Sequence, residues 1–199
     1  MRRILRELRR AIRRRSDNDP RLPLLAKMPK GAVCAEVGVW KGDFSLLIRH
    51  ITKPARLHLI DPWEFQPEFP DRIYGGSIAK GQMDMDRIHE YVKSRFRKYP
   101  ELVVNRGKSA EILREFEDSY FDWVYIDGNH SYETVREDLE ISLAKVRPGG
   151  IIAGDDYWWD EANRFPVKRA VEDFMQSNNR PGTLEILDQQ FMITLREQR

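Results

Sequence analysis

Three carboxylates follow two short apolar runs that have the composition of buried strands. Asp127 comes directly after residues 123–126, and Asp155 and Asp156 follow residues 151–153. If the two runs are neighbouring parallel strands, roughly 4.8 Å apart, their ends bring the three carboxylates to one point. Like charges this close raise each other's pKa unless a cation neutralises them, and carboxylate oxygens suit Mg²⁺, Ca²⁺ or Mn²⁺. Adjacent strand residues point to opposite faces, so Asp155 and Asp156 can share a metal only if the chain leaves the strand there.

The carboxylates also have a purely structural interpretation. Asp127 can belong to a turn with the glycine that follows it, and the Asp155-Asp156 pair can cap the next segment. His130 lies three residues after Asp127, at the start of a predicted helix. A histidine there can take the proton of a hydroxyl whose pKa a metal has lowered, or it can simply orient the loop or touch a bound ligand. Asp127 and His130 are therefore the candidate catalytic residues.

A glycine-containing loop follows the first predicted strand, residues 32–37. Gly38 and Gly42 allow a tight turn and a close approach to a ligand, but they do not form a dinucleotide fingerprint. With Gly38 as the middle glycine of G-x-G-x-x-G, the other two positions hold Glu36 and Lys41. The carboxylate of Glu36 would repel a pyrophosphate and would favour a ligand that carries an ammonium or a sulfonium.

S-adenosylmethionine (SAM) has both of these cationic groups and an adenosine ribose. Asp61 ends the second predicted strand, residues 56–60, where an acidic side chain can accept hydrogen bonds from both ribose hydroxyls of SAM or of NAD. The loop 106–109, after the third predicted strand, is expected near the adenine. Taken singly, the glycines are ordinary turn residues and Asp61-Pro62 is a helix-breaking turn. Glu36 and the absent third glycine favour SAM over NAD.

The elements that would position these residues alternate along the chain. Pro20 and Pro23 predict a linker, and after it apolar runs typical of strands take turns with amphipathic helical patterns, which predicts a parallel sheet covered on both faces. The last two apolar runs flank residues 188–190 and predict a hairpin that adds an antiparallel edge. The predicted strands are residues 32–37, 56–60, 102–105, 123–126, 151–153, 183–187 and 191–195, and the predicted helices are 44–51, 85–99, 109–116, 132–146 and 167–175.

One connection is unusually long. Residues 62–82 are rich in proline, glycine and aromatic side chains. A connection of this length between strands is usually functional, so a lid over a pocket is expected, with a plain surface excursion as the alternative.

Length and composition limit the remaining interpretations. A chain of 199 residues with 41% hydrophobic residues suits one globular domain, and a net charge of +2 argues against a general nucleic-acid binder. The single cysteine excludes a disulfide scaffold and a zinc site built on cysteine thiolates, and it fits a reducing compartment such as the cytoplasm.

The charge is unevenly distributed along the chain. Residues 1–30 hold nine arginines and two lysines against three acidic residues, a net charge of +8 that leaves −6 for residues 31–199. We therefore divide the chain into a basic amphipathic helix with its linker, 1–30, and a domain, 31–199. Residues 1–16 lack the unbroken apolar stretch of a signal peptide, and they are expected to pack on the domain or on a second subunit rather than on a membrane surface.

Four stretches together resemble the class I SAM-dependent methyltransferases, and most closely the bacterial branch related to macrocin and cephalosporin-pathway O-methyltransferases. The resemblance covers about residues 31–196 and implies a Rossmann-like, doubly wound α/β fold, with a mostly parallel seven-stranded sheet whose last strand is antiparallel. It implies SAM contacts at Glu36, Gly38, Gly42, Asp61, Ser109 and Asp127, and a divalent ion, Mg²⁺ or another, on Asp127, Asp155 and Asp156. The stretches are E-V-G-V-W-K-G, L-I-D-P-W, D-W-V-Y-I-D-G-N-H-S-Y-E-T-V-R-E-D-L and P-G-G-I-I-A-G-D-D-Y.

The sequence thus predicts a cytoplasmic SAM-dependent methyltransferase that methylates an oxygen of a small hydroxylated acceptor with the help of a divalent metal. A sugar, a glycosylated natural product or a phenol is the expected acceptor, and nucleic acid is not. Three alternatives stay open: a metal-independent N- or O-methyltransferase, a SAM-binding interaction protein without catalysis, and a nicotinamide oxidoreductase. The sequence also leaves open a homo-oligomer.

Overall fold

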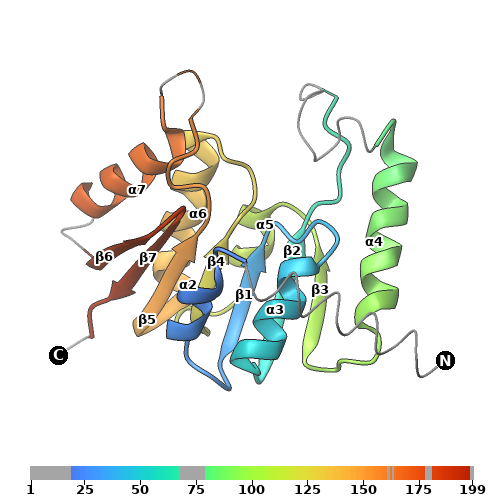
Figure 1. Ribbon diagram of the computed structural model, residues 1–199, viewed down its shortest axis with the longest axis horizontal. Coiled ribbons are helices and arrows are strands. Elements are labelled where there is room, and N and C mark those ends of the chain that lie inside the picture. Colours follow the sequence, from blue (N-terminus) through green and yellow to red (C-terminus); the bar gives the residue numbers. More distant parts are fainter. Residues whose placement is uncertain (1–18, 68–78, 161, 163, 178–180, 198–199) are drawn as a thin grey trace.

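The computed structural model describes residues 19–67, 79–160, 162, 164–177 and 181–197. Seven strands in this part of the chain form one sheet in the order β3-β2-β1-β4-β5-β7-β6 (Figure 1). The first five pair in parallel, and β7 runs antiparallel to both of its neighbours, which confirms the predicted fold class. The strands are β1 (Val33–Val37), β2 (Arg56–Asp61), β3 (Leu102–Arg106), β4 (Phe121–Ile126), β5 (Val146–Gly154), β6 (Gly182–Leu187) and β7 (Gln190–Leu195).

Helices cover both faces of this sheet (Figure 1). One hydrophobic cluster joins the sheet to the first three helices, and a second cluster joins it to the last three. The helices are α2 (Leu22–Lys27), α3 (Asp43–Thr52), α4 (Gln82–Phe96), α5 (Ser109–Arg114), α6 (Tyr132–Lys145) and α7 (Pro166–Ser177). Among the described residues, no helix has the length and apolar character needed to cross a membrane.

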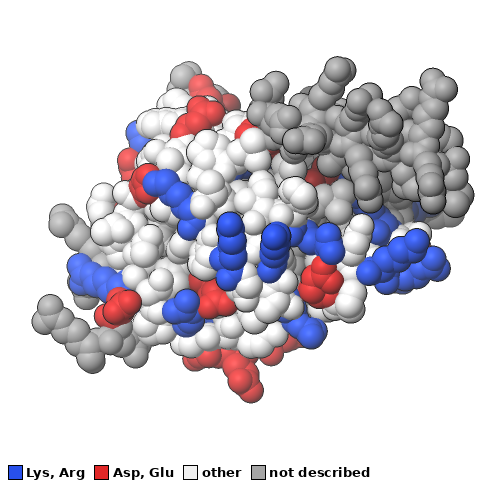
Figure 2. All heavy atoms as spheres, turned by 60° about the horizontal axis from the view of Figure 1, so that its bottom comes forward, with Lys and Arg blue, Asp and Glu red and all other residues white. Residues whose placement is uncertain are grey.

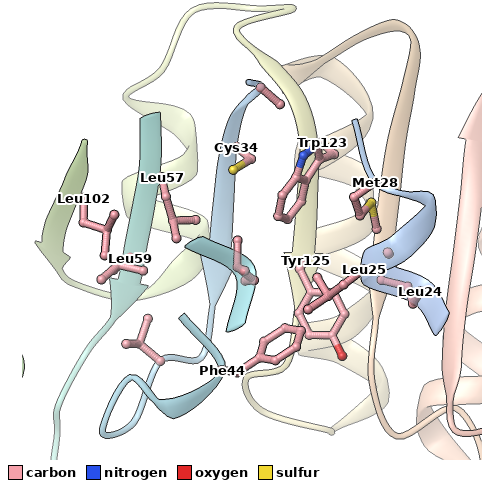
Figure 3. Close-up of a cluster of buried hydrophobic side chains, with 14 of the residues drawn as sticks. Leu24, Leu25, Met28, Cys34, Phe44, Leu57, Leu59, Leu102, Trp123 and Tyr125 are labelled. Carbon is pink, nitrogen blue, oxygen red and sulfur yellow. The ribbon is translucent and has the colours of Figure 1, made fainter. Parts of the chain in front are cut away.

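The central strand β4 shows why the sequence forms this layered structure. Trp123 and Tyr125 belong to the cluster on one face, while Val124 and Ile126 belong to the cluster on the other. Successive strand residues point to opposite faces, so a strand that is covered on both sides must be apolar at nearly every position. Figure 3 shows Trp123 and Tyr125 within the first cluster.

The structure corrects the prediction of a linker near Pro20 and Pro23. Pro23 lies in the first turn of α2, where a proline does not disturb the hydrogen bonds of a helix. Leu24 and Leu25 of this helix are 0% and 1% exposed, and they belong to the first hydrophobic cluster (Figure 3). The hydrophobic core therefore begins before residue 31. The predicted amphipathic helix at residues 1–16 lies outside the described residues.

Only part of the predicted lid can be followed. Residues 68–78 lie outside the described residues. Before them, Trp63 is fully buried, and its indole nitrogen donates a hydrogen bond to the carbonyl oxygen of Trp40 (2.9 Å). The beginning of the long connection is thus packed against the loop that follows β1.

Candidate active site

The predicted site residues lie along the carboxyl edge of the parallel strands. Backbone hydrogen bonds join the ends of these strands: Gly38 N donates to Ile60 O (2.9 Å), Asp127 N to Val37 O (2.7 Å), and Asp155 N to Ile126 O (3.1 Å). The winding direction of the sheet reverses between β1 and β4, which is where open α/β sheets bind their ligands. The glycine loop and Asp127 flank this position.

Gly38 is required by the sheet itself. Its φ is +87°, and a Cβ at this position would lie 1.9 Å from the backbone oxygen of Asp127. The loop after β1 therefore rests directly on the backbone of the loop after β4. Gly42, with a φ of +74°, is the N-cap residue just before α3, and a Cβ there would lie 2.5 Å from the Phe96 ring.

Asp61 fixes the shape of the glycine loop. Its Oδ2 accepts hydrogen bonds from the backbone N–H groups of Val39 and Trp40 (2.9 Å each), and its Oδ1 accepts one from Trp63 N (2.7 Å). The residue is 1% exposed. Its predicted contact with a ribose stays a prediction, and the structure shows a second role that the sequence did not reveal.

Glu36 is buried beneath the same loop. It is 1% exposed, and its Oε2 accepts a hydrogen bond from Ser45 Oγ (2.5 Å). Burial raises the pKa of Glu36 to about 8, against the opposing effect of the Ser45 hydrogen bond. The group is therefore mostly protonated at pH 7, so it can attract a cationic ligand only if it ionises when that ligand binds.

Ser109 is the first residue of α5, and its side chain hydrogen-bonds Asp138 of α6. Burial raises the pKa of Asp138 to about 7. This contact joins α5 to α6 near the predicted adenine position. The predicted contact between Ser109 and SAM stays a prediction.

Asp127, His130 and Asp156 converge beside the glycine loop. His130 Nε2 is 3.7 Å from Asp127 Oδ1, and His130 Nδ1 is 3.1 Å from Asp156 Oδ2. The chain leaves β5 at Gly154, and Asp156 adopts a left-handed conformation with a φ of +58°, so its carboxylate can turn toward His130. One ligand atom from each of the three residues lies within 4.8 Å of the others, which makes them a candidate metal-binding group.

The surroundings shift the protonation of this group. Burial raises the pKa of Asp127 to about 6, although the neighbouring His130 side chain opposes the shift. Burial acts to lower the pKa of His130, but the adjacent carboxylates of Asp127 and Asp156 outweigh it, so the pKa of His130 lies above its ordinary value. Burial also raises the pKa of Asp156.

Asp155 lies next to this group but is turned away from it. Its Oδ1 accepts hydrogen bonds from Gln190 Nε2 (2.8 Å) and from Asp156 N (2.9 Å). Its Oδ2 is 3.9 Å from Arg21 Nη1. Of the three predicted metal ligands, the structure therefore brings Asp127 and Asp156 together with His130, and it engages Asp155 elsewhere.

Sequence reasoning missed Arg21, Gln190 and Tyr125. Arg21 Nη1 lies 3.4 Å from Asp127 Oδ2, although residue 21 belongs to the predicted linker. The Tyr125 hydroxyl, His130 Nε2 and Gln190 Oε1 are buried and have no hydrogen-bond partner among the described residues. Unpartnered buried polar atoms are costly, and their number at one place indicates room for water or a ligand. No local pattern signals Arg21 or Gln190, because packing of α2 and of the β6–β7 hairpin places them.

Aromatic side chains border the candidate site. Tyr157 is 4% exposed and packs into the core, whereas Trp159 is 38% exposed. The Trp159 ring centre lies 5.7 Å from that of His130, and Trp159 N donates to Asp156 O (2.8 Å). Tyr157 thus covers the sheet, and Trp159 lies on the rim of the site.

Comparisons with known proteins agree with this arrangement. A family described as a methyltransferase domain matches residues 35–157, more than half of the chain and the whole region from Glu36 to Asp156. No curated protein matches the chain significantly.

Solved structures share the fold at low sequence identity. The O-methyltransferase NovP is 19% identical with a TM-score of 0.59, over 90% of this chain and 80% of that one. The cofactor-bound protein Rv0187 from MTB is 16% identical with a TM-score of 0.57, over 91% of this chain and 92% of that one. MycE of the mycinamycin biosynthetic pathway, solved with Mg and SAH, is 15% identical with a TM-score of 0.53, over 84% of this chain and 46% of that one.

The family match and the sheet order thus account for the same residues along the carboxyl edge. The chain belongs to the family defined by this methyltransferase domain, and it is a SAM-dependent methyltransferase.

Proposed function

We propose that this methyltransferase transfers the methyl group of SAM to a hydroxyl oxygen of a small acceptor, with the assistance of a divalent cation. The observation that carries the proposal is the convergence of Asp127, His130 and Asp156 beside the glycine loop. Two structural neighbours support it: NovP is an O-methyltransferase, and MycE was solved with Mg and SAH.

In the proposed complex, SAM lies along the carboxyl edge between the glycine loop and α5. Gly38 and Gly42 shape the loop, Glu36 faces the cationic end, Asp61 faces the ribose, and Ser109 lies near the adenine. Asp127 borders the reacting end of SAM. These assignments rest on the shared edge of the sheet and on the resemblance to class I methyltransferases.

The residues present fit a divalent cation. The candidate group offers two carboxylates and one imidazole, and His130 Nε2 lacks a hydrogen-bond partner among the described residues. Asp127 and Asp156 would hold the ion, with Asp155 as a neighbouring carboxylate that a side-chain rotation can add. A bound cation would lower the pKa of the acceptor hydroxyl.

His130 is the proposed proton acceptor of the reaction. The acceptor hydroxyl loses its proton to His130, its oxygen forms the new bond to the methyl carbon, and the bond between that carbon and the SAM sulfur breaks. Asp127 and Asp156 lie beside the two ring nitrogens and orient the imidazole. Trp159, on the rim, is in a position to contact the acceptor.

A metal-independent methyltransferase is the second candidate, because Arg21 already supplies a positive charge 3.4 Å from Asp127. The turnover that remains in EDTA distinguishes the metal-assisted enzyme from the metal-independent one. We expect calorimetry to show that S-adenosylhomocysteine (SAH) binds whether or not EDTA is present. We expect methyl transfer from labelled SAM to catechol or to a methyl rhamnoside to stop when EDTA is added and to return when Mg²⁺ is restored. Turnover that survives EDTA selects the metal-independent enzyme, and SAH binding without turnover on either probe shows that neither probe is the acceptor.

The same proposal includes a small-molecule acceptor and a cytoplasmic location. The face in Figure 2 mixes basic and acidic side chains, and residues 31–199 carry a net charge of −6, which does not favour a nucleic acid as the acceptor. The single cysteine, Cys34, is a buried free thiol and suits a reducing compartment. Whether the chain forms a homo-oligomer stays a prediction.

A further inference from the structure

Arg21 reaches the site from the short segment that precedes α2. Its Nε and Nη2 donate hydrogen bonds to the two carboxylate oxygens of Asp19 (2.9 Å each), and its guanidinium lies 4.0 Å from the centre of the Phe44 ring. Its remaining nitrogen, Nη1, is 3.4 Å from Asp127 Oδ2 and 3.9 Å from Asp155 Oδ2. The guanidinium is therefore held at one end and faces two site carboxylates with the other.

The contacts that this guanidinium makes with Asp19 are stronger than those it makes with Asp127 and Asp155. The pair with Asp19 is bidentate and short, and the flat ring of Phe44 supports it. The contacts to Asp127 and Asp155 are long and single. The guanidinium is a rigid plane, so Nη1 leaves the site carboxylates when Arg21 and Asp19, which lie in the same short segment, move together, or when the pair with Asp19 opens.

Two buried side chains around the same carboxylates indicate that something else belongs there. Tyr125 and Gln190 are fully buried, yet the Tyr125 hydroxyl and Gln190 Oε1 lack partners among the described residues. Gln190 holds Asp155, and Tyr125 interacts electrostatically with Asp127, Asp155 and Arg21. Figure 3 shows the Tyr125 hydroxyl beside the Phe44 ring, at the end of the side chain away from Trp123.

We propose that the Arg21 guanidinium and a divalent cation are alternative occupants of the carboxylate cluster, so that the cation binds only when Nη1 leaves Asp127 and Asp155. This inference rests on the proposed metal assistance and deepens it. The side chains involved are only 17–22% exposed, so water and salt screen the repulsion between guanidinium and cation incompletely. Arg21 thus lowers the affinity of the site for the ion, and it places a positive charge beside Asp127 and Asp155 until the ion arrives.

The test measures Mn²⁺ binding to the full-length protein by electron paramagnetic resonance and calorimetry, without SAM or acceptor. We expect Arg21→Met to bind Mn²⁺ at least about tenfold more tightly than the wild type, and Arg21→Lys, which keeps the charge, to stay close to the wild type. Adding Asp127→Asn to Arg21→Met should remove the gain, which places the ion at this cluster. Arg21→Gln is a second neutral variant, and circular dichroism checks that each variant folds.

Arg49→Met is the matched control. Arg49 also lies over an aromatic ring, Tyr99 (3.8 Å), and pairs with a carboxylate, Glu101 (2.6 Å), but at the amino edge of the sheet. We expect its Mn²⁺ affinity to equal that of the wild type.

Two outcomes overturn the inference. If the wild type binds Mn²⁺ and Arg21→Met binds it equally or more weakly, the inference fails while metal assistance stands. If neither protein binds Mn²⁺ and turnover resists EDTA, metal assistance fails as well. SAH binding, measured separately, keeps both results distinct from the assignment as a SAM-dependent methyltransferase.

Discussion

At the scale of single residues, the acidic groups predicted to bind SAM also hold the protein together. Asp61 accepts three backbone hydrogen bonds around the glycine loop, and Glu36 is buried against Ser45. Burial raises the pKa of Glu36 to about 8, so the side chain is mostly protonated and uncharged near pH 7. An attraction between Glu36 and a cationic ligand must therefore be accompanied by proton release.

That release can be measured. At pH 6.5, where Glu36 and the amino group of SAH both carry their protons, an ion pair between them requires roughly one proton to leave per SAH bound. Calorimetry in buffers of different ionisation enthalpy counts this proton. Glu36→Gln should bind SAH more weakly and release none. If the wild type exchanges no proton, Glu36 remains protonated in the complex and does not face the ammonium.

Gly38 gives a sharper steric prediction. In Gly38→Ala the new methyl group would meet the Asp127 backbone at 1.9 Å, so we expect a loss of more than about 3 kcal/mol in the free energy of unfolding, or failure to fold. Gly31→Ala is the control, because Gly31 has a similar φ of +69° with open space around its Cα. Gly31→Ala should lower the free energy of unfolding, measured by urea denaturation, by only about 1 kcal/mol. Equal costs for both variants would contradict the clash.

At the scale of elements, the sequence predicted each strand that the sheet contains, and the predicted bounds agree with the observed ones closely at β2, β3 and β4. Apolar runs and their alternation are local properties, so a sequence reveals them well. Helix α2 was missed because Pro20 before it and Pro23 within it suggested a linker, although a proline in the first turn is compatible with a helix. Six residues are too few to show a helical period.

Strand β2 carries a histidine whose burial makes stability depend on pH. His58 is 6% exposed, its Nε2 lies 3.2 Å from the Tyr120 hydroxyl, and burial lowers its pKa to about 4. The folded pKa lies below the ordinary value of 6.5, so the unfolded chain binds more protons between pH 6.5 and 4. The contribution of His58 to stability is therefore complete above pH 6.5 and declines as the pH falls toward 4, by at most roughly 3 kcal/mol.

Urea denaturation of His58→Gln checks this dependence. The variant should lose less stability than the wild type between pH 7.5 and pH 4.5, because glutamine does not titrate. The carboxylates contribute equally to both proteins, so the difference between the two pH slopes isolates His58. Parallel slopes would show that His58 does not titrate in this range.

At the scale of the whole molecule, the segment before β1 connects the core to the site. Leu24 and Leu25 of α2 are buried in the first cluster, and Arg21, one residue before the helix, lies beside Asp127. The predicted boundary at residue 31 therefore falls inside a packed unit. Removing residues 19–30 would expose apolar side chains and would also take Arg21 from the carboxylates.

The packing of α2 predicts a measurable cost. Leu25→Ala should lower the free energy of unfolding by about 2–5 kcal/mol, because it leaves a cavity in the core. Chemical denaturation measures the change, and a chain that begins at residue 31 should fail to fold cooperatively. A change within about 0.5 kcal/mol, as for an exposed residue, would show that α2 is not part of the core.

The sequence by itself determined the order of the strands and of the helices that follow β1, the glycine loop, and the strand ends that carry Asp61, Asp127, Asp155 and Asp156. Each of these follows from local composition and from the rule that the ends of parallel strands share one edge. Only the tertiary structure decided that His130 faces Asp127 and Asp156, that Gln190 holds Asp155, and that Arg21 lies beside Asp127. These contacts depend on the left-handed turn at Asp156, on the β6–β7 hairpin and on α2. Their positions follow from packing between segments far apart in the chain, which no local pattern encodes.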